Sequence, residues 1–208
     1  MVVAGLQNAG HEAFLVGGCV RDLFLGIKPK DYDVTTNATP EEMLALFPSA
    51  FYDNKFGTVG IPLENLPETE HTGVVEVTTY RTEKGYTDRR HPEKVEWGKT
   101  IEEDLSRRDF TINAMALKLS HNDSHIIDPY NGQEDLKNNL IRAVGDPTLR
   151  FKEDALRLMR AIRFATQLSF SIEEKTLHAI IEDSPFLSEI SNERVRDELL
   201  KILTSEFP

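Results

Sequence analysis

The stretch AFLVGGCVRD at residues 13–22, followed by DYDVTT at residues 31–36, decides the fold of the first part of this chain. Four apolar residues at 13–16 predict a short strand, and residues 19–25 return to helical spacing before Gly26, a residue type that often follows a helix C-terminus. Residues 32–36 are rich in β-forming residues and predict a second strand. A strand, a diglycine, a helix and another strand together predict a domain that mixes a sheet with helices.

Elements of both kinds continue outward from this stretch. Residues 1–9 predict a short helix, and TPEE at residues 39–42 predicts a capping box that opens a helix through Phe47. Residues 74–80 predict a strand, and residues 82–99 predict a long loop or a loose hairpin. Residues 134–203 are helical in pattern, apart from turns at 145–147 and 184–185. We therefore expect a sheet-containing part over residues 1–133 and an all-helical part over residues 134–208.

Gly17 and Gly18 lie between the first predicted strand and the helix that follows. A diglycine at this place lets the backbone approach a phosphate, with helix N–H groups pointing at it. Arg21, one turn into the helix, can add a charge-assisted contact. Taken alone, the two glycines are explained more simply as a turn.

Two aspartates, Asp31 and Asp33, are spaced so that both carboxylates project from one face of a strand. Like charges this close are costly unless a cation lies between them, and such hard oxygen ligands suit Mg²⁺. The alternative is a solvated strand end. Glu76 lies among valines in the predicted strand 74–80 and is a candidate third carboxylate. It can also be an outward-pointing residue of a half-buried strand.

Two later segments carry clustered charges. In RRDFTINA, residues 107–114, the arginines can bind phosphate and Asp109 and Asn113 can hydrogen-bond a ribose, although a charged helix start has the same pattern. Residues 150–163 predict a helix with one polar stripe and an apolar opposite face. That stripe contains Arg150, Asp154, Arg157 and Arg160, with Arg163 at its margin. A surface helix with ion pairs three residues apart is the simpler explanation of this segment alone.

Composition limits the class of protein. The chain has 208 residues, a net charge of −11 and one cysteine, Cys19, which excludes an intramolecular disulfide and a Cys-rich zinc site. No segment approaches the roughly 20 apolar residues of a membrane span. These features predict a cytoplasmic protein. The acidic balance argues mildly against a polynucleotide partner, because such partners usually require a basic face.

Four segments taken together resemble one family. GGCVRD, DYDVTT, RRDFTINAMA and EDALRLMRAIRF are similar, in order and spacing, to motifs of the tRNA nucleotidyltransferase and bacterial poly(A) polymerase family. More narrowly, they resemble the bacterial-type (class II) CCA-adding enzymes. The resemblance covers nearly the whole chain and extends to residues 128–147 and 190–203. It implies an α+β fold: a polymerase β-like nucleotidyltransferase head with an antiparallel or mixed sheet, over residues 1–133, and an all-α nucleotide-selecting neck, over residues 134–208.

The resemblance also implies a reaction and its cofactor. Asp31 and Asp33 would bind Mg²⁺, with Glu76 as the third catalytic carboxylate. The 3′-hydroxyl of a tRNA would attack the α-phosphate of CTP or ATP and release pyrophosphate. The implied partners are the 3′ end of tRNA and the two nucleotides, with no membrane and no obligate protein partner.

Nucleotide-binding roles follow from the same resemblance. Asp154 and Arg157 match the pair that reads the base, since cytosine and adenine each present an amino donor beside a ring-nitrogen acceptor. Uracil and guanine present the reverse order and leave both side chains mispaired, which costs about 1–3 kcal/mol for each buried group. The other implied contacts are Gly17, Gly18 and Arg21 at the triphosphate, Arg108 with Asp109 and Asn113 at the ribose, and Arg160 and Arg163 beside the nucleotide.

Several alternatives remain. The loop of residues 82–99 resembles a flexible element used in the switch from C to A addition. Its segment EKGYTDRRHPEKV, residues 83–95, looks complete, which favours a CCA- or A-adding enzyme over a CC-only one. A poly(A) polymerase of the same superfamily shares the motifs. A non-catalytic nucleotide sensor would not need paired aspartates, and a helical RNA-binding adaptor would need a broad basic surface. Full-length members continue with a body and a tail, which we expect to be absent from this chain.

Overall fold

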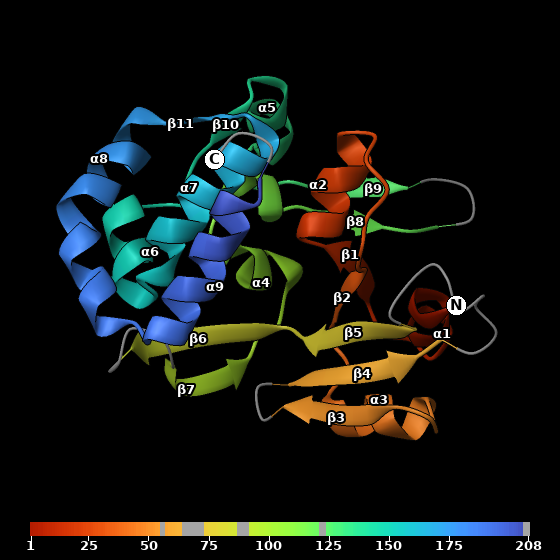
Figure 1. Ribbon diagram of the computed structural model, residues 1–208. Coiled ribbons are helices and arrows are strands. Elements are labelled where there is room, and N and C mark those ends of the chain that lie inside the picture. Colours follow the sequence, from red (N-terminus) through yellow and green to blue (C-terminus); the bar gives the residue numbers. More distant parts are fainter. Residues whose placement is uncertain (55–56, 64–72, 87–91, 121–123, 206–208) are drawn as a thin grey trace. The chain divides into compact units, whose positions relative to one another are not determined.

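The structure, a computed structural model, describes residues 1–54, 57–63, 73–86, 92–120 and 124–205 (Figure 1). The chain divides into two compact units, and each of them is assembled from separate stretches of sequence. Unit 1 comprises Met1–Thr82, Val95–Leu105 and Met115–Pro129. Unit 2 comprises Glu83–Lys94, Ser106–Ala114 and Tyr130–Pro208. Among the helices of the described ranges, none is both long and apolar enough to cross a membrane.

A seven-stranded sheet forms the centre of unit 1, with the strand order β3-β4-β5-β2-β1-β8-β9 (Figure 1). Its neighbouring strands pair antiparallel except for β2 and β5, which pair in parallel in the middle of the sheet. The mixed sheet agrees with the α+β fold expected from the sequence. Its strands are β1 (Ala13–Val16), β2 (Asp33–Thr36), β3 (Phe51–Asn54), β4 (Thr58–Pro62), β5 (Val74–Thr79), β8 (Ala116–Lys118) and β9 (His125–Ile127).

Short helices flank the strands of unit 1 and bury apolar side chains. They are α1 (Val2–Asn8), α2 (Gly18–Phe24), α3 (Pro40–Leu46) and α4 (Ile101–Ser106). The predicted capping box of α3 is present: the Glu42 backbone N–H donates to Thr39 Oγ1 at 3.3 Å, and the Thr39 N–H donates to Glu42 Oε2 at 2.8 Å. Leu6, Val20 and Met43 are fully buried, one from each of the first three helices. Burial of these side chains fixes the helices on the sheet.

Unit 2 is mainly helical. Helix α7 packs against α9, and α6 packs against α8 (Figure 1). Phe110 is fully buried and meets the Phe164 ring edge-on, with centroids 5.7 Å apart. The elements are the 3₁₀ turns η1 (Thr111–Asn113) and η2 (Ser184–Glu189), helices α5 (Gly132–Lys137), α6 (Pro147–Glu153), α7 (Leu156–Leu168), α8 (Glu174–Asp183) and α9 (Asn192–Leu203), and strands β10 (Leu140–Ile141) and β11 (Ser171–Ile172).

The expectation of an all-α part over residues 134–208 is wrong. Strands β10 and β11 pair in parallel inside unit 2, and the unit also takes in Ser106–Ala114 from earlier in the chain. Two-residue strands carry no alternating pattern, so periodicity cannot detect them. An all-α neck with the expected bounds is therefore not found in the part of the chain that the structure describes.

Residues 82–99 were expected to form a loop or a loose hairpin. Strands β6 (Arg81–Tyr86) and β7 (Pro92–Trp97) pair as a separate two-stranded sheet, which confirms the hairpin alternative. Residues 87–91, at the centre of the segment assigned to the C-to-A switch, lie outside the described residues. The role assigned to this segment stays a prediction.

Candidate functional site

The diglycine forms the turn between β1 and α2. Gly17 has φ +73° and ψ −135°, a conformation that side-chain-bearing residues avoid, so its glycine identity has a steric cause. Gly18 differs, because a Cβ built there would lie 3.6 Å from Arg21 Nη2, an ordinary contact. The Arg21 guanidinium donates to Asp22 Oδ1, at 2.9 Å from Nε and 2.7 Å from Nη2. The turn and Arg21 are thus side by side, as the sequence predicted.

A single row of residues crosses four strands of the sheet. Asp33 on β2 is the register partner of Glu76 on β5, Glu76 is the partner of Gly60 on β4, and Gly60 is the partner of Phe51 on β3. Side chains of directly opposed residues leave the same face of a sheet. Asp33, Glu76 and Phe51 therefore project to one face, with the side-chain-free position of Gly60 between the last two.

This row opens into a pocket of about 440 Å³ in unit 1. Its lining residues are Asp31, Tyr32, Asp33, Phe51, Gly60, Val74 and Glu76. Asp31, Asp33 and Glu76 are exposed, so their carboxylates reach solvent without a desolvation penalty. The structure thus brings together the three acidic residues that the sequence singled out.

The three carboxylates do not form a preassembled metal cage. Among the described residues, no group of three or more acidic, histidine or cysteine side chains is close enough to hold a metal ion. Mg²⁺ does not require such a cage, because it is commonly held by one or two carboxylates, waters and substrate phosphates. A pocket lined by hard oxygen donors from β2 and β5 therefore fits a magnesium ion that arrives with a phosphate-bearing ligand.

Asp109 is the hub of a buried network in unit 2. Its Oδ2 accepts hydrogen bonds from Arg160 Nε at 2.8 Å and Arg160 Nη2 at 2.5 Å. Its Oδ1 accepts from the Phe110 backbone N–H at 2.8 Å and from Asn113 Nδ2 at 3.2 Å. Burial opposes ionisation of this carboxyl, but the charge and hydrogen bonds of Arg160, with Arg157 and Asn113, hold its pKa at about 2. Asp109 therefore fixes both Asn113 and Arg160.

The side chains of Asp154 and Arg157, at the junction of α6 and α7, form ion pairs with other residues, while the Arg157 backbone N–H donates to the Asp154 carbonyl at 3.0 Å. Asp154 accepts from Arg194 Nη1 at 3.3 Å, from Arg194 Nη2 at 2.9 Å and from the Leu156 backbone N–H at 3.1 Å. Arg157 Nη1 donates to Glu153 Oε2 at 2.6 Å. Arg157 also donates to the Arg150 carbonyl at 3.1 Å and the Arg107 carbonyl at 3.0 Å. The ion pair that spacing suggested, Asp154–Arg157, is replaced by two others.

The remaining predicted residues of unit 2 are less closely grouped. Arg163 Nε donates to Glu198 Oε2 at 2.6 Å, and its guanidinium lies 4.2 Å from the centroid of the Phe164 ring. Glu198 is buried, so this pair joins α7 to α9. Burial lowers the pKa of Arg163. Arg108 is half-buried in the segment between α4 and η1.

Three residues that lie beside predicted site residues of their own unit were not singled out from the sequence. Glu153 pairs with Arg157 at the i,i+4 spacing, and this spacing is a signal that the sequence does carry. Arg194 meets Asp154 across 40 positions of chain, and Phe51 reaches the acidic pocket only through strand register. No local pattern identifies contacts of these two kinds.

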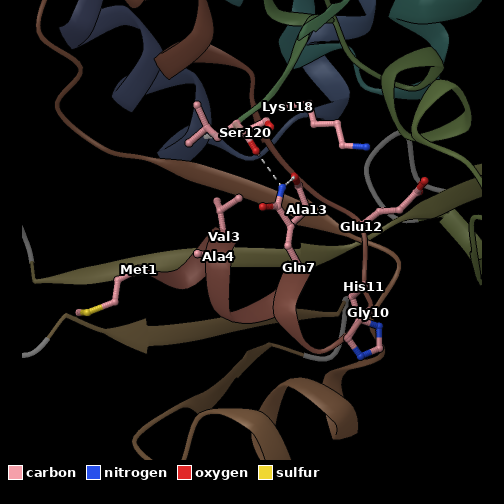
Figure 2. Close-up of a pocket in the computed structure, with 11 residues that line it drawn as sticks. Met1, Val3, Ala4, Gln7, Gly10, His11, Glu12, Ala13, Lys118 and Ser120 are labelled. Carbon is pink, nitrogen blue, oxygen red and sulfur yellow. Dashed lines mark hydrogen bonds between the residues drawn. The ribbon is translucent and has the colours of Figure 1, made fainter. Parts of the chain in front are cut away.

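A second cavity of unit 1, of about 520 Å³, contains none of the predicted site residues (Figure 2). It lies among α1, β1 and the end of β8. Gln7 Nε2 donates there to the Ala13 carbonyl at 3.4 Å and to the Leu119 carbonyl at 3.1 Å. These contacts link α1 to the sheet and give both N–H groups of the Gln7 amide an acceptor.

Comparison with known proteins identifies related chains. Residues 13–142 match the model of the family described as the poly A polymerase head domain, and residues 169–208 match one described as a probable RNA and SrmB-binding site of polymerase A. A CCA-adding enzyme of Lactobacillus helveticus is 49% identical over 202 residues, which are 97% of this chain and 48% of that protein. The chain thus spans about half the length of the curated relatives it matches.

Solved structures extend the likeness to three dimensions. The Bacillus stearothermophilus CCA-adding enzyme in complex with CTP has a TM-score of 0.85 and 40% identity, over 99% of this chain and 48% of that one. The Thermotoga maritima CCA-adding enzyme complexed with tRNA has a TM-score of 0.79 and 32% identity, over 100% of this chain and 46% of that one. The resemblance drawn from the four motifs is confirmed, and the matched residues contain the whole acidic row and Asp109. This chain belongs to the poly A polymerase head domain family.

Proposed function

We propose that the chain is the nucleotidyltransferase part of a CCA-adding enzyme. It adds C and A, from CTP and ATP and without a template, to the 3′ end of tRNA, with release of pyrophosphate. The observation that carries the proposal is the pairing of Asp33 with Glu76 across β2 and β5, with Asp31 at the same pocket. The CCA-adding enzymes at 45–49% identity support the choice of reaction.

The acidic pocket is the proposed place of chemistry. Asp31 and Asp33 would hold Mg²⁺, with Glu76 as a third carboxylate. A bound magnesium ion supplies a lower pKa for the attacking hydroxyl and neutralises charge that develops on the phosphate. The tRNA 3′-hydroxyl loses its proton to solvent and its oxygen forms a bond to the α-phosphorus. The bond from that phosphorus to the bridging oxygen breaks, and pyrophosphate leaves. Gly17, Gly18 and Arg21 would contact the triphosphate.

Asp154 and Arg157 are the proposed readers of the base. A carboxylate offers about four lone-pair positions, and Asp154 uses three of them for Arg194 and the Leu156 N–H. The position left on Oδ2 can accept from the amino group of cytosine or adenine. Arg157 has about five N–H donors, of which three serve Glu153, Arg150 and Arg107. Its remaining donors can reach a ring nitrogen.

The Asp109 network is the proposed support for the sugar. The Asp109 carboxylate accepts four hydrogen bonds from protein groups, so we assign it the role of positioning Asn113 and Arg160. Asn113 and Arg108 would then contact the ribose. Arg160 and Arg163 would steady the nucleotide from α7. The division of labour between unit 1 and unit 2, as catalytic and nucleotide-selecting parts, belongs to this proposal, as does a cytoplasmic location.

A poly(A) polymerase is the second candidate, because both matching family descriptions name that enzyme. Product length separates the two functions. A CCA-adding enzyme stops after at most three additions to a tRNA that lacks CCA, whereas a poly(A) polymerase extends an open-ended tail of A. Gel separation of products from labelled ATP and CTP distinguishes these outcomes directly.

The deciding experiment follows incorporation of each labelled nucleotide into tRNAs that lack A, CA or CCA, with and without Mg²⁺. We expect incorporation of C and A alone, lost in Asp33→Asn. The matched control is Glu41→Gln, an exposed carboxylate of α3 outside the acidic pocket, which should keep full activity. Equal incorporation of U or G, or full activity of Asp33→Asn, would contradict the proposal. Calorimetry with CTP, ATP, UTP and GTP tests nucleotide selection separately from tRNA binding.

A further inference from the structure

Phe51 is an exposed aromatic residue at the acidic pocket. It lines that pocket beside Asp31, Asp33 and Glu76, and 46% of its surface is exposed. The covered part of the ring gains free energy from burial, and the exposed part gains none in the free protein. The exposed part faces the pocket and is available to a ligand.

Gly60 is the reason that the ring can lie where it does. A Cβ built on Gly60 would be 2.5, 2.8 and 2.9 Å from Phe51 Cζ, Cε2 and Cε1, distances that real Cβ atoms do not tolerate. The far edge of the ring thus occupies the space that a side chain at position 60 would fill. Gly60 is also the register partner of Glu76. The ring is consequently held over the strand next to Glu76, on the face from which Asp33 projects.

A ring supported from below by a glycine and open to a pocket is a surface for stacking. Proteins that hold single-stranded nucleic acid commonly stack successive bases on such aromatic side chains, and the contact tolerates every base because each has a π-face. Two bases meet in the proposed reaction: that of the incoming nucleotide and that of the RNA terminus which offers the hydroxyl. The incoming base already has its proposed readers in Asp154 and Arg157.

We propose that Phe51 is a stacking platform for the terminal base of the RNA acceptor, and this inference rests on the proposed function. Stacking on Phe51 holds the terminal nucleotide by its base, so that its 3′-hydroxyl is kept at the carboxylates of the row. The terminal base of the acceptor changes as nucleotides are added. A contact that recognises any base therefore suits this acceptor better than hydrogen bonds to base edges.

A matched control exists in the same unit. Tyr52, the next residue of β3, is 46% exposed and leaves the opposite face of the strand. Tyr52 does not line the acidic pocket. Loss of an exposed aromatic side chain of β3 is thus common to Phe51→Leu and Tyr52→Leu, and only Phe51→Leu removes a ring from the pocket.

The experiment measures KM for an RNA acceptor and for CTP, with acceptors that end in a normal or an abasic nucleotide. We expect Phe51→Leu to raise the acceptor KM about tenfold, the size of one base-aromatic stack, and to leave the KM for CTP unchanged. The abasic end should raise the acceptor KM of the wild type by a similar factor. It should not raise the acceptor KM of Phe51→Leu any further. Phe51→Tyr should restore the wild-type value, and Tyr52→Leu should match the wild type.

Three results would overturn the inference: a CTP KM that rises in place of the acceptor KM, an abasic effect of equal size in both proteins, or no abasic effect in the wild type. The last measurement needs no variant, so it decides even if Phe51→Leu fails to fold. If the wild type adds no nucleotide, the proposed function fails. The fluorescence anisotropy of a labelled single-stranded RNA, with a normal or an abasic terminal nucleotide, then measures RNA binding without catalysis. Equal affinity for the two RNAs would refute the stacking inference.

Discussion

The Asp154 carboxylate is held by Arg194, whose guanidinium donates from Nη1 at 3.3 Å and from Nη2 at 2.9 Å. A two-point contact of this kind fixes the plane of the carboxylate as well as its charge. The side chain of Asp154 is 20% exposed, so one acceptor position can still meet a ligand. Arg194, on α9, is thereby a positioning residue for a side chain at the junction of α6 and α7.

Replacement of Arg194 should therefore weaken nucleotide selection. We expect Arg194→Met to lower the preference in kcat/KM for CTP over UTP about tenfold, because Asp154 loses the orientation that presents its acceptor to an amino group. Arg194→Lys should keep the charge and recover part of the preference. The control is Arg196→Met on the same helix, where the side chain is exposed and pairs with Asp197. An unchanged preference in Arg194→Met would refute the positioning role.

Loss of the Asp109–Arg160 pair should destabilise the protein. The Asp109 side chain is 9% exposed and is held at 2.5 Å by Arg160 Nη2. Removal of one partner of a buried pair costs about 3–5 kcal/mol, because the other charge stays buried without compensation. We expect the free energy of unfolding of Arg160→Met, measured by urea denaturation, to be about 3–5 kcal/mol lower than that of the wild type. Lys137→Met, which removes an exposed partner of Glu134, should change it by less than about 1 kcal/mol.

The pKa of Asp109 predicts a pH dependence of stability. A carboxyl with a pKa of about 2 in the folded state and its ordinary value of 3.8 in the unfolded state stabilises the fold above the unfolded value. That contribution, about 2 kcal/mol, is lost as the pH falls from about 4 to about 2. Unfolding curves measured across this pH window should show that the free energy of unfolding falls less steeply in Asp109→Asn than in the wild type. Parallel curves for both proteins would show that Asp109 does not contribute.

The two glycines of the β1–α2 turn should respond differently to alanine. Gly17→Ala forces a side-chain-bearing residue to φ +73°, which should cost about 1–3 kcal/mol of stability. Gly18→Ala meets only an ordinary contact with Arg21, so its stability should change little. If the triphosphate approaches the backbone at Gly18, the same variant should raise the KM for CTP. Thermal unfolding and steady-state kinetics on the two variants separate the steric role from the binding role.

Local features of the fold were predictable, and contacts through register were not. The capping box of Thr39 and Glu42 depends on residues three apart, so the sequence alone predicted it. The three carboxylates were identified individually, but the facing of Asp33 and Glu76 depends on a parallel strand pair whose partners are 43 residues apart. Strand β4 was missed because Gly60 and Pro62 interrupt its alternation. Strand β3 was missed because its four residues, FYDN, do not alternate between apolar and polar side chains. The Asp154–Arg194 pair required the packing of α7 on α9.

The way unit 2 is assembled limits how this architecture can be divided. Its segment Ser106–Ala114 lies earlier in the sequence than part of unit 1. That segment is joined to the helices by backbone hydrogen bonds from the Thr111 N–H to the Arg142 carbonyl at 2.9 Å and from the Val144 N–H to the Asp109 carbonyl at 3.0 Å. A recombination event near residue 130 would separate Arg160 from Asp109 and strip Phe110 from the core. Neither unit can therefore be exchanged as one contiguous segment of sequence without loss of these contacts.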